Sequence, residues 1–135
     1  MNRELKFRVW DKTNDRFYIP NGFIKEWPVI QTDGLVGFVG EFNEFQYGNE
    51  IKQEDYIFQQ YLGINDKNGK EMCEGDVLAW SSLRYEIVWN KTYAKFHFPT
   101  LTKQDGMYYL PEGEIRKSEI IGNIFETPHY KEMEF

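Results

Sequence analysis

The chain has 135 residues, of which 41% are hydrophobic and 18% aromatic, and its formal net charge is −6. That length is enough for one domain to bury its own core, so folding requires neither a disulfide nor a structural metal. The acidic balance disfavours a nucleic-acid-binding module, whose affinity comes mainly from basic contacts to phosphate, and no apolar run approaches the ~18 residues of a membrane span.

The first 55 residues predict a β-rich extension. Residues 5–10 alternate in hydrophobicity as a strand does, and they lack the apolar core of a signal peptide. A turn-rich stretch over residues 11–15 leads to a second strand at residues 17–19. Two further strands are expected within residues 23–30 and 35–45. So short a piece would be marginal alone, so we expect it to pack on the rest of the chain.

The strand pattern becomes clearer from Tyr56. A strand over residues 56–64 is followed by Asn68-Gly69, which predicts a tight hairpin turn of type I′ with both residues at positive φ. Gly75 permits a second sharp turn, and the Asp76 carboxylate is expected to accept hydrogen bonds from nearby backbone amides. Residues 77–80 then begin the next strand.

Two alternating segments come next. In residues 84–89, Tyr85, Ile87 and Trp89 are expected to share one face. In residues 93–98, Ala94, Phe96 and Phe98 would share a face, which leaves His97 exposed on the other side. A short turn over residues 90–92 is expected to join the two segments.

The C-terminal part predicts two more strands and a helix. The strands are expected over residues 107–110 and 119–125, with Gly122 marking a bulge or a barrel corner. Thr127-Pro128 has the pattern of a helix N-cap followed by proline in the first turn, which predicts one or two turns over residues 128–134.

Regularly spaced short strands are typical of a small β-barrel or sandwich. We therefore expect a mainly β fold, with an SH3-like barrel over residues 56–135 and the β-rich extension over residues 1–55 packed on it.

Three blocks of sequence then point to a family. They are the N-terminal KFRVWD, a central block with QYLG, DKNGKE and EGDV, and IGNIFE near the end; they begin at Lys6, Gln60 and Ile121. In these blocks the chain resembles the YopX-like proteins of bacteriophages and prophages. The resemblance implies an SH3-like barrel with an N-terminal extension, in a phage or prophage product without established catalytic residues. The single cysteine, Cys73, and the lack of a leader favour the reducing cytoplasm of the bacterial host cell.

Several polar residues resemble catalytic or metal sites, but each fits a structural role better. A calcium loop with Gly69 at its sixth position would place Ile64 at the first ligand, which cannot bind the ion. Glu74 and Asp76 are two residues apart, yet no second base is near them in the sequence. Cys73 lies between glutamates that disfavour a thiolate, so it predicts packing rather than a nucleophile.

The two histidines, His97 and His129, have no metal-binding spacing. We therefore expect neither enzyme activity nor a metal or other cofactor.

The remaining candidates concern binding. Lys67 and Lys70 in the hairpin, with Lys91, Lys95 and Lys103 elsewhere, could contact phosphate, although lysines on turns are usually only solvated. Trp80, Tyr108 and Tyr109 could stack on bases or belong to the core or to an interface.

We predict a non-enzymatic module that binds proteins or itself, because the chain is rich in aromatic residues and lacks a catalytic constellation. The expected partner is a second copy, another phage protein or a host protein, with no membrane and no evident small-molecule substrate. The alternative is a nucleic-acid-associated regulatory protein, which would require a basic patch.

Overall fold

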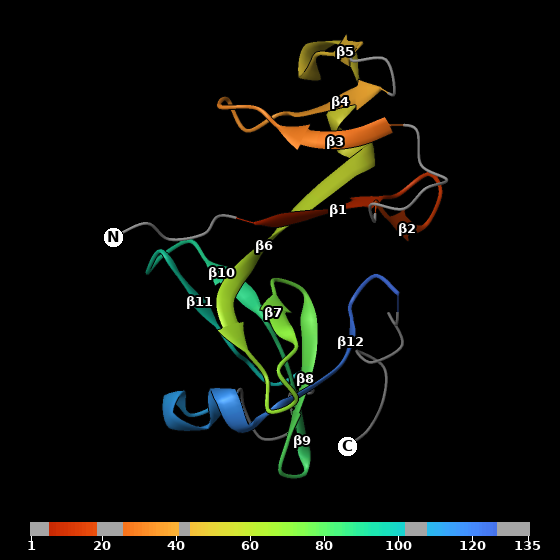
Figure 1. The fold of residues 1–135 in the computed structure, drawn as a ribbon. Helices are drawn as coiled ribbons and strands as arrows, with labels where there is room; N and C mark the ends of the chain where they lie inside the picture. Colours follow the sequence, from red (N-terminus) through yellow and green to blue (C-terminus); the bar gives the residue numbers. More distant parts are fainter. Residues whose placement is uncertain (1–5, 19–25, 41–43, 102–107, 127–135) are drawn as a thin grey trace. The chain divides into compact units, whose positions relative to one another are not determined.

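The computed structural model describes residues 6–18, 26–40, 44–101 and 108–126 (Figure 1). The fold is mainly β, as expected, and includes a curled half-barrel sheet. The described residues form two compact units. The N-terminal unit is Phe7–Gln59, and the C-terminal unit comprises Lys6 and the described residues from Gln60 onward. Strand β6 (Tyr56–Asn65) begins in the first unit and ends in the second.

The N-terminal unit contains two groups of strands. In the first, β1 lies between β2 and the beginning of β6, and in the second β4 lies between β3 and β5. The elements are β1 (Phe7–Asp11), β2 (Arg16–Phe17), β3 (Glu26–Ile30), β4 (Val36–Gly40), β5 (Phe45–Gln46) and the 3₁₀ helices η1 (Gly48–Glu50) and η2 (Gln53–Asp55).

A small aromatic core holds this unit together. Val9, Val36 and Phe38 are buried, and the partly buried rings of Tyr18 and Tyr56 pack against them. The Phe38 and Tyr56 ring centroids are 5.1 Å apart in an edge-to-face arrangement, which is favourable for aromatic pairs.

Asp11 fixes the turn between β1 and β2. Its buried carboxylate accepts hydrogen bonds from the Thr13 and Asn14 amides, from the Asn14 side chain and from the Tyr18 hydroxyl. Burial alone would raise the pKa of Asp11, but these hydrogen bonds stabilise the charged form and hold the pKa below its ordinary value. The expected turn over residues 11–15 is therefore an aspartate-braced turn.

The C-terminal unit is built from three groups of strands. They are the second half of β6 with β7, the hairpin β10–β11, and a sheet in the order β12-β8-β9. The elements are β7 (Glu71–Cys73), β8 (Asp76–Trp80), β9 (Leu83–Glu86), β10 (Val88–Asn90), β11 (Lys95–His97), the 3₁₀ helix η3 (Glu112–Lys117) and β12 (Glu119–Asn123).

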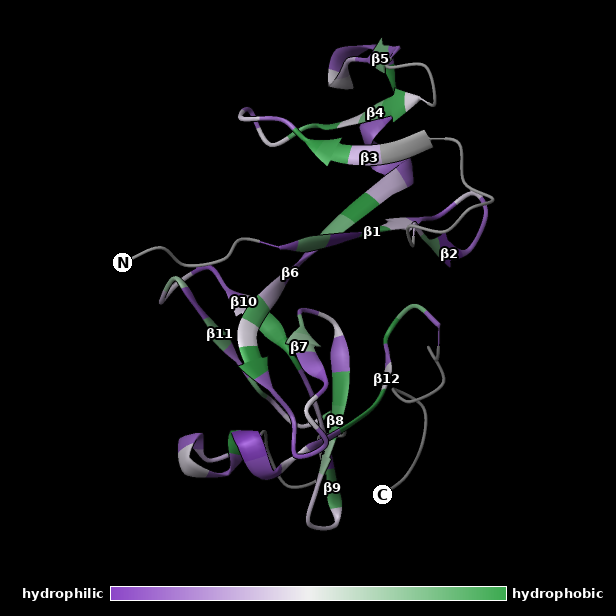
Figure 2. Ribbon diagram, in the orientation of Figure 1, coloured by the Kyte–Doolittle hydropathy of each residue, from purple (hydrophilic) through white to green (hydrophobic). Residues whose placement is uncertain are grey.

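The main core lies in this unit. It consists of buried side chains from several of its strands and from the segment before η3, namely Met72, Leu78, Tyr85, Ile87, Phe98 and Leu110. In Figure 2 hydrophobic residues lie mainly on the strands, whereas η3 is mostly hydrophilic. Among the described residues, no helix is long and apolar enough to cross a membrane.

The hairpin after β6 differs from the expected turn. Gly69 has a φ of 82°, but Asn68 is not among the residues with positive φ, so the predicted type I′ turn is wrong. The Gly69 amide donates to the Asp66 carbonyl, and the Asp66 amide donates to the Lys70 carbonyl. This is a three-residue loop with glycine in the left-handed position, which needs only one positive φ.

The side chain of Asp66 stabilises this three-residue loop. One carboxylate oxygen accepts from the Asn68 and Lys70 amides, and the other accepts from the Ile120 amide of β12, each at 2.9 Å. Burial would raise the pKa of Asp66, yet the hydrogen bonds and the nearby Lys70 ammonium hold it below its ordinary value. One buried carboxylate thus joins the hairpin to a strand 54 residues later.

The other two predicted turn features are confirmed. Gly75 has a φ of 85°, and Asp76 accepts a hydrogen bond from the Cys73 amide at 2.8 Å across the tight β7–β8 turn. The pairing of β12 with β8 shifts register between Ile120 and Gly122, which is the expected bulge.

Other predictions need correction. Tyr85 and Ile87 are buried but Trp89 is 43% exposed, because the predicted strand is interrupted at Ile87 and its faces do not continue. Instead of a strand at residues 107–110, the described part of that segment makes one isolated bridge, between Tyr109 and Pro99. The three 3₁₀ helices were not foreseen. The proposed C-terminal helix at residues 128–134, with Thr127, lies outside the described residues.

Candidate ligand-binding site

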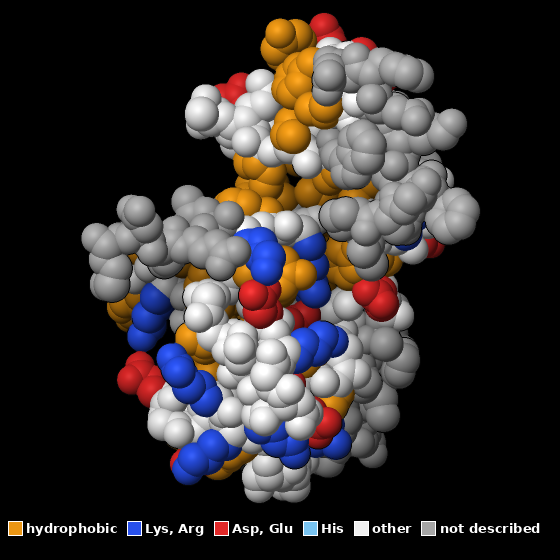
Figure 3. All heavy atoms as spheres, viewed as in Figure 1, with side chains coloured by type: hydrophobic (Ala, Val, Ile, Leu, Met, Phe, Trp, Pro, Cys, Tyr) orange, Lys and Arg blue, Asp and Glu red, His pale blue; other side chains and the backbone are white. Residues whose placement is uncertain are grey.

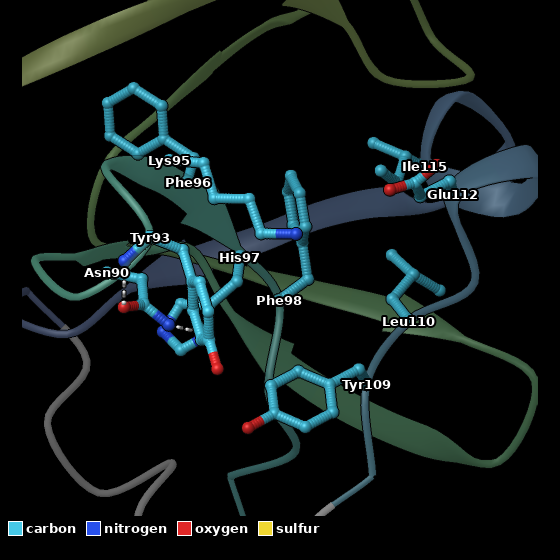
Figure 4. A pocket seen from close by; sticks show the side chains of 10 residues that line it. All are labelled: Asn90, Tyr93, Lys95, Phe96, His97, Phe98, Tyr109, Leu110, Glu112 and Ile115. Carbon is cyan, nitrogen blue, oxygen red and sulfur yellow. Dashed lines mark hydrogen bonds between the residues drawn. The ribbon is translucent and has the colours of Figure 1, made fainter.

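A cavity of about 540 Å³ opens on the C-terminal unit (Figure 4). Its walls come from the β10–β11 hairpin, from the segment that bridges to Pro99, and from η3. The lining residues are Asn90, Tyr93, Lys95, Phe96, His97, Phe98, Tyr109, Leu110, Glu112 and Ile115. Its size is within the range of small-molecule and peptide side-chain pockets.

The hairpin that forms one wall is fixed by Asn90. The Asn90 side-chain oxygen accepts from the Thr92 amide at 2.9 Å and from the Tyr93 amide at 3.2 Å. Ala94 then adopts a φ of 51°, which lets the chain return as β11. The predicted turn at residues 90–92 therefore extends through Ala94, which belongs to the turn and not to the strand face expected for it. This turn places Tyr93 at the edge of the cavity.

Aromatic rings make up much of the wall. Tyr93 is 72% exposed and Tyr109 54% exposed, while Phe98 and Leu110 are buried and belong to the core. The His97 and Tyr109 rings lie 5.6 Å apart between centroids at an interplanar angle of 32°. The Leu110 amide donates to the Phe98 carbonyl, which holds the Tyr109 segment beside β11. The cavity thus has an apolar floor and exposed aromatic sides.

His97 is half-buried, which corrects the expectation of an exposed strand residue. Its Nδ1 lies 3.5 Å from the Asn90 side-chain nitrogen, and its ring faces Tyr109. The alternation within β11 did place His97 opposite its neighbours, but the segment from Tyr109 covers that second face.

Two side chains of opposite charge line the cavity. Lys95 extends from β11 across the cavity in the direction of η3, and Glu112 extends from η3 on the other side (Figure 4). In the described part of the chain, neither side chain has an ion pair or a hydrogen bond. By contrast, three other lysines of this unit are paired with a glutamate: Lys6 with Glu71, Lys67 with Glu119 and Lys117 with Glu114.

Of the predicted binding residues, the structure brings Tyr109 and Lys95 into the cavity. Tyr108 is equally exposed, but it is absent from the lining, and its backbone pairs with Thr100. Trp80 is partly buried against the core. Lys67 forms an ion pair with Glu119, and Lys70 lies at the exposed hairpin.

The other lysines predicted as phosphate contacts, which are Lys91, Lys95 and Lys103, do not all lie in the cavity. Lys95 lines the cavity and Lys91 lies in the adjacent turn, whereas Lys103, like His129, lies outside the described residues.

The sequence did not identify the cavity as a unit. Asn90, Tyr93 and Lys95 are close in the chain, but Glu112 and Ile115 come from a helix that was not expected. The available signal was the density of aromatic residues around a polar turn, from Trp89 to Phe98.

The polar residues near Cys73 have structural roles. Asp76 is buried and braces the turn, and the Cys73 thiol is buried. Within the described ranges no group of three or more His, Cys, Asp or Glu residues could hold a metal ion.

The comparisons with known proteins support a family and a fold. Residues 6–130 match the model of a family described as YopX protein. No curated protein matches the chain. The crystal structure of protein EF1440 from Enterococcus faecalis is similar with a TM-score of 0.52 and 20% identity, over 94% of this chain and 97% of that chain. At that identity the likeness concerns the fold alone.

Proposed function

The chain belongs to the YopX protein family, and we propose that it serves a phage or prophage as a non-enzymatic interaction module in the bacterial cytoplasm. Its partner is a protein, and the aromatic cavity of the C-terminal unit is the docking site. We further propose that this unit is an SH3-like barrel. The observation that carries the proposal is a cavity of about 540 Å³ with strongly exposed tyrosines on its walls.

Tyrosine is enriched at protein interfaces because its ring offers apolar area and its hydroxyl offers a hydrogen bond. Tyr93 and Tyr109 leave most of that area uncovered, and their hydroxyls make no hydrogen bond in the described part of the chain. A partner that covers these rings would bury their apolar surface, and it could accept or donate a hydrogen bond at each hydroxyl in place of water. Energetic hot spots at interfaces have this composition.

A nucleic-acid-associated role is the alternative, and the charges argue against it. Lys67 and Lys117 are paired with glutamates, so their charges are already compensated. On the face shown in Figure 3, basic and acidic side chains are interspersed over the C-terminal unit. Binding to phosphate would require basic groups gathered without acidic neighbours.

The proposal is tested by affinity capture from cells that carry the prophage. The wild-type chain is compared with Tyr93→Ala/Tyr109→Ala and with a matched control, Tyr108→Ala, which removes an equally exposed tyrosine outside the lining. We expect one or a few proteins to be retained by wild type and by the control, and to be lost in the double variant. Equal capture by all three chains would show that the cavity is not the docking site.

Self-association is measured separately by light scattering after size exclusion. If the partner is a second copy, wild type and Tyr108→Ala form oligomers at tens of micromolar, on the order of ordinary protein affinities, and the double variant is a monomer. A wild-type monomer at that concentration would remove the homo-oligomer from the proposal and leave a different protein as partner.

A further inference from the structure

We propose that the occupant of the cavity is an extended peptide segment of the partner, with a large apolar or aromatic side chain in the cavity and an acidic side chain that pairs with Lys95. This inference rests on the proposed function and names the chemistry of the partner at the same site.

The apolar part of the inference comes from the floor and walls. Phe98 and Leu110 are buried at the base, and Ile115 of η3 contributes an aliphatic side. Tyr93 and Tyr109 stand exposed beside them. A volume of about 540 Å³ exceeds what one side chain fills, so it accommodates an anchor residue together with its own backbone. Aromatic and large aliphatic anchors are the groups that such a floor retains, because they gain most from leaving water.

The acidic part comes from Lys95. In the described part of the chain its ammonium has no partner, although three other lysines of the same unit each have a glutamate. Lys95 is exposed beside the aromatic side chains of the lining, so a partner that covers these rings would also shield the pair of Lys95 with its carboxylate from water. A charge pair in such a place gives specificity more than bulk affinity.

Glu112 sets the polarity of the site. It also lacks a partner in the described part of the chain, and it extends from the side opposite Lys95 (Figure 4). One cation and one anion suit a peptide, whose backbone offers amide N–H groups to Glu112 and whose acidic side chain reaches Lys95. A nucleic acid strand would meet Glu112 with phosphate, so the lining favours a peptide over a polyanion.

The test is a selection from a random linear peptide library, displayed on messenger RNA, against the immobilised full chain. We expect the enriched sequences to share an aromatic or large aliphatic residue with Asp or Glu within a few positions of it. A fluorescein-labelled peptide of the leading sequence is then titrated by fluorescence polarisation against the full chain and its variants.

The variants separate the contribution of Lys95 from general electrostatics. Lys95→Glu should weaken binding about tenfold or more, and Lys95→Gln should have an intermediate effect. Lys91→Glu makes the same change on another exposed lysine, which lies in the turn before β11 and outside the lining, and should alter binding less than about threefold. The peptide with its acidic residue changed to lysine should bind the Lys95→Glu chain more tightly than it binds the wild-type chain. Circular dichroism checks that each variant is folded.

Three outcomes would overturn the inference: enriched peptides without an acidic residue, equal weakening by Lys95→Glu and Lys91→Glu, or binding of a labelled oligothymidylate that Lys95→Glu abolishes. The last result would favour the nucleic-acid alternative. If one of these outcomes is found but Tyr93→Ala/Tyr109→Ala still fails to capture the protein that wild type retains, only the proposed peptide chemistry is wrong and the proposed function stands. If capture is unaffected by the double variant, the proposed function fails as well.

Discussion

Replacing Asp66 with alanine should destabilise the C-terminal unit strongly, because one buried carboxylate joins its hairpin to β12. The side chain is 6% exposed and accepts three backbone hydrogen bonds of 2.9 Å, from Asn68, Lys70 and Ile120. The substitution removes both acceptor oxygens and with them all three hydrogen bonds.

The expected magnitude follows from where the three amides lie. A hydrogen bond to a charged group contributes about 1.5–3 kcal/mol, and a buried amide left unpaired costs about 1–3 kcal/mol. Asn68 and Lys70 are at an exposed turn, so their amides regain water, whereas Ile120 is half-buried and its amide is not readily hydrated. We therefore expect a loss of about 2–4 kcal/mol in the free energy of unfolding.

Urea denaturation followed by tryptophan fluorescence measures this loss, and hydrogen exchange locates it by faster exchange in β12. Asp66→Asn keeps one oxygen for the turn amides but points an NH₂ group toward the Ile120 amide, so about half of the loss is expected. Asp33→Ala is the control, because that exposed aspartate accepts one amide in another turn. A loss below about 0.5 kcal/mol for Asp66→Ala, or no change in the exchange of β12, would refute the reasoning.

Three further predictions follow from other buried or constrained residues. Asp11 and Asp66 both have folded-state pKa values below the ordinary 3.8, so on acidification the unfolded chain takes up protons before the folded chain does. The free energy of unfolding should therefore be constant above about pH 5 and fall as the pH drops below 3.8. Urea titrations across that range measure this fall, which should be shallower in Asp66→Asn. Gly69→Ala should lower the free energy of unfolding by about 1 kcal/mol through its left-handed backbone alone, since an added Cβ meets nothing within 4 Å. An unchanged midpoint of thermal unfolding would contradict the φ of 82° at this position. Cys73 is fully buried, so its thiol should react with an aromatic disulfide reagent only after denaturation, and rapid reaction of the native chain would disprove its packing role.

Much of the local structure could be predicted because it depends on neighbours in the chain. The Gly75 turn with the Asp76 brace and the bulge before Gly122 were all evident from residue type. The type I′ turn is wrong because Asp66 accepts hydrogen bonds from the Asn68 and Lys70 amides, which favours a three-residue loop with positive φ at Gly69 and not at Asn68. Only the contact of the same carboxylate with the Ile120 amide, 54 residues away, leaves no local pattern.

The candidate site shows the same division. Tyr109 was singled out from the sequence as a possible binding residue, but its neighbours in space were not. The sequence predicts a solvated or phosphate-contacting Lys95 and an exposed His97, because nothing local shows that the Tyr109 segment lies beside β11. Glu112 could not be considered, since the short 3₁₀ helix that carries it has no strong periodic signal.

By itself the sequence determined the mainly β class, the family and most strand positions, because alternation and turn residues act over a few neighbouring positions. The tertiary structure decided which strands are neighbours, which distant amide the Asp66 carboxylate binds, and which side chains surround the cavity. Those outcomes depend on contacts between residues far apart in the chain, such as Asp66 with Ile120 and His97 with Tyr109. Such contacts leave no local pattern, since their free energy is gained only when the whole unit packs.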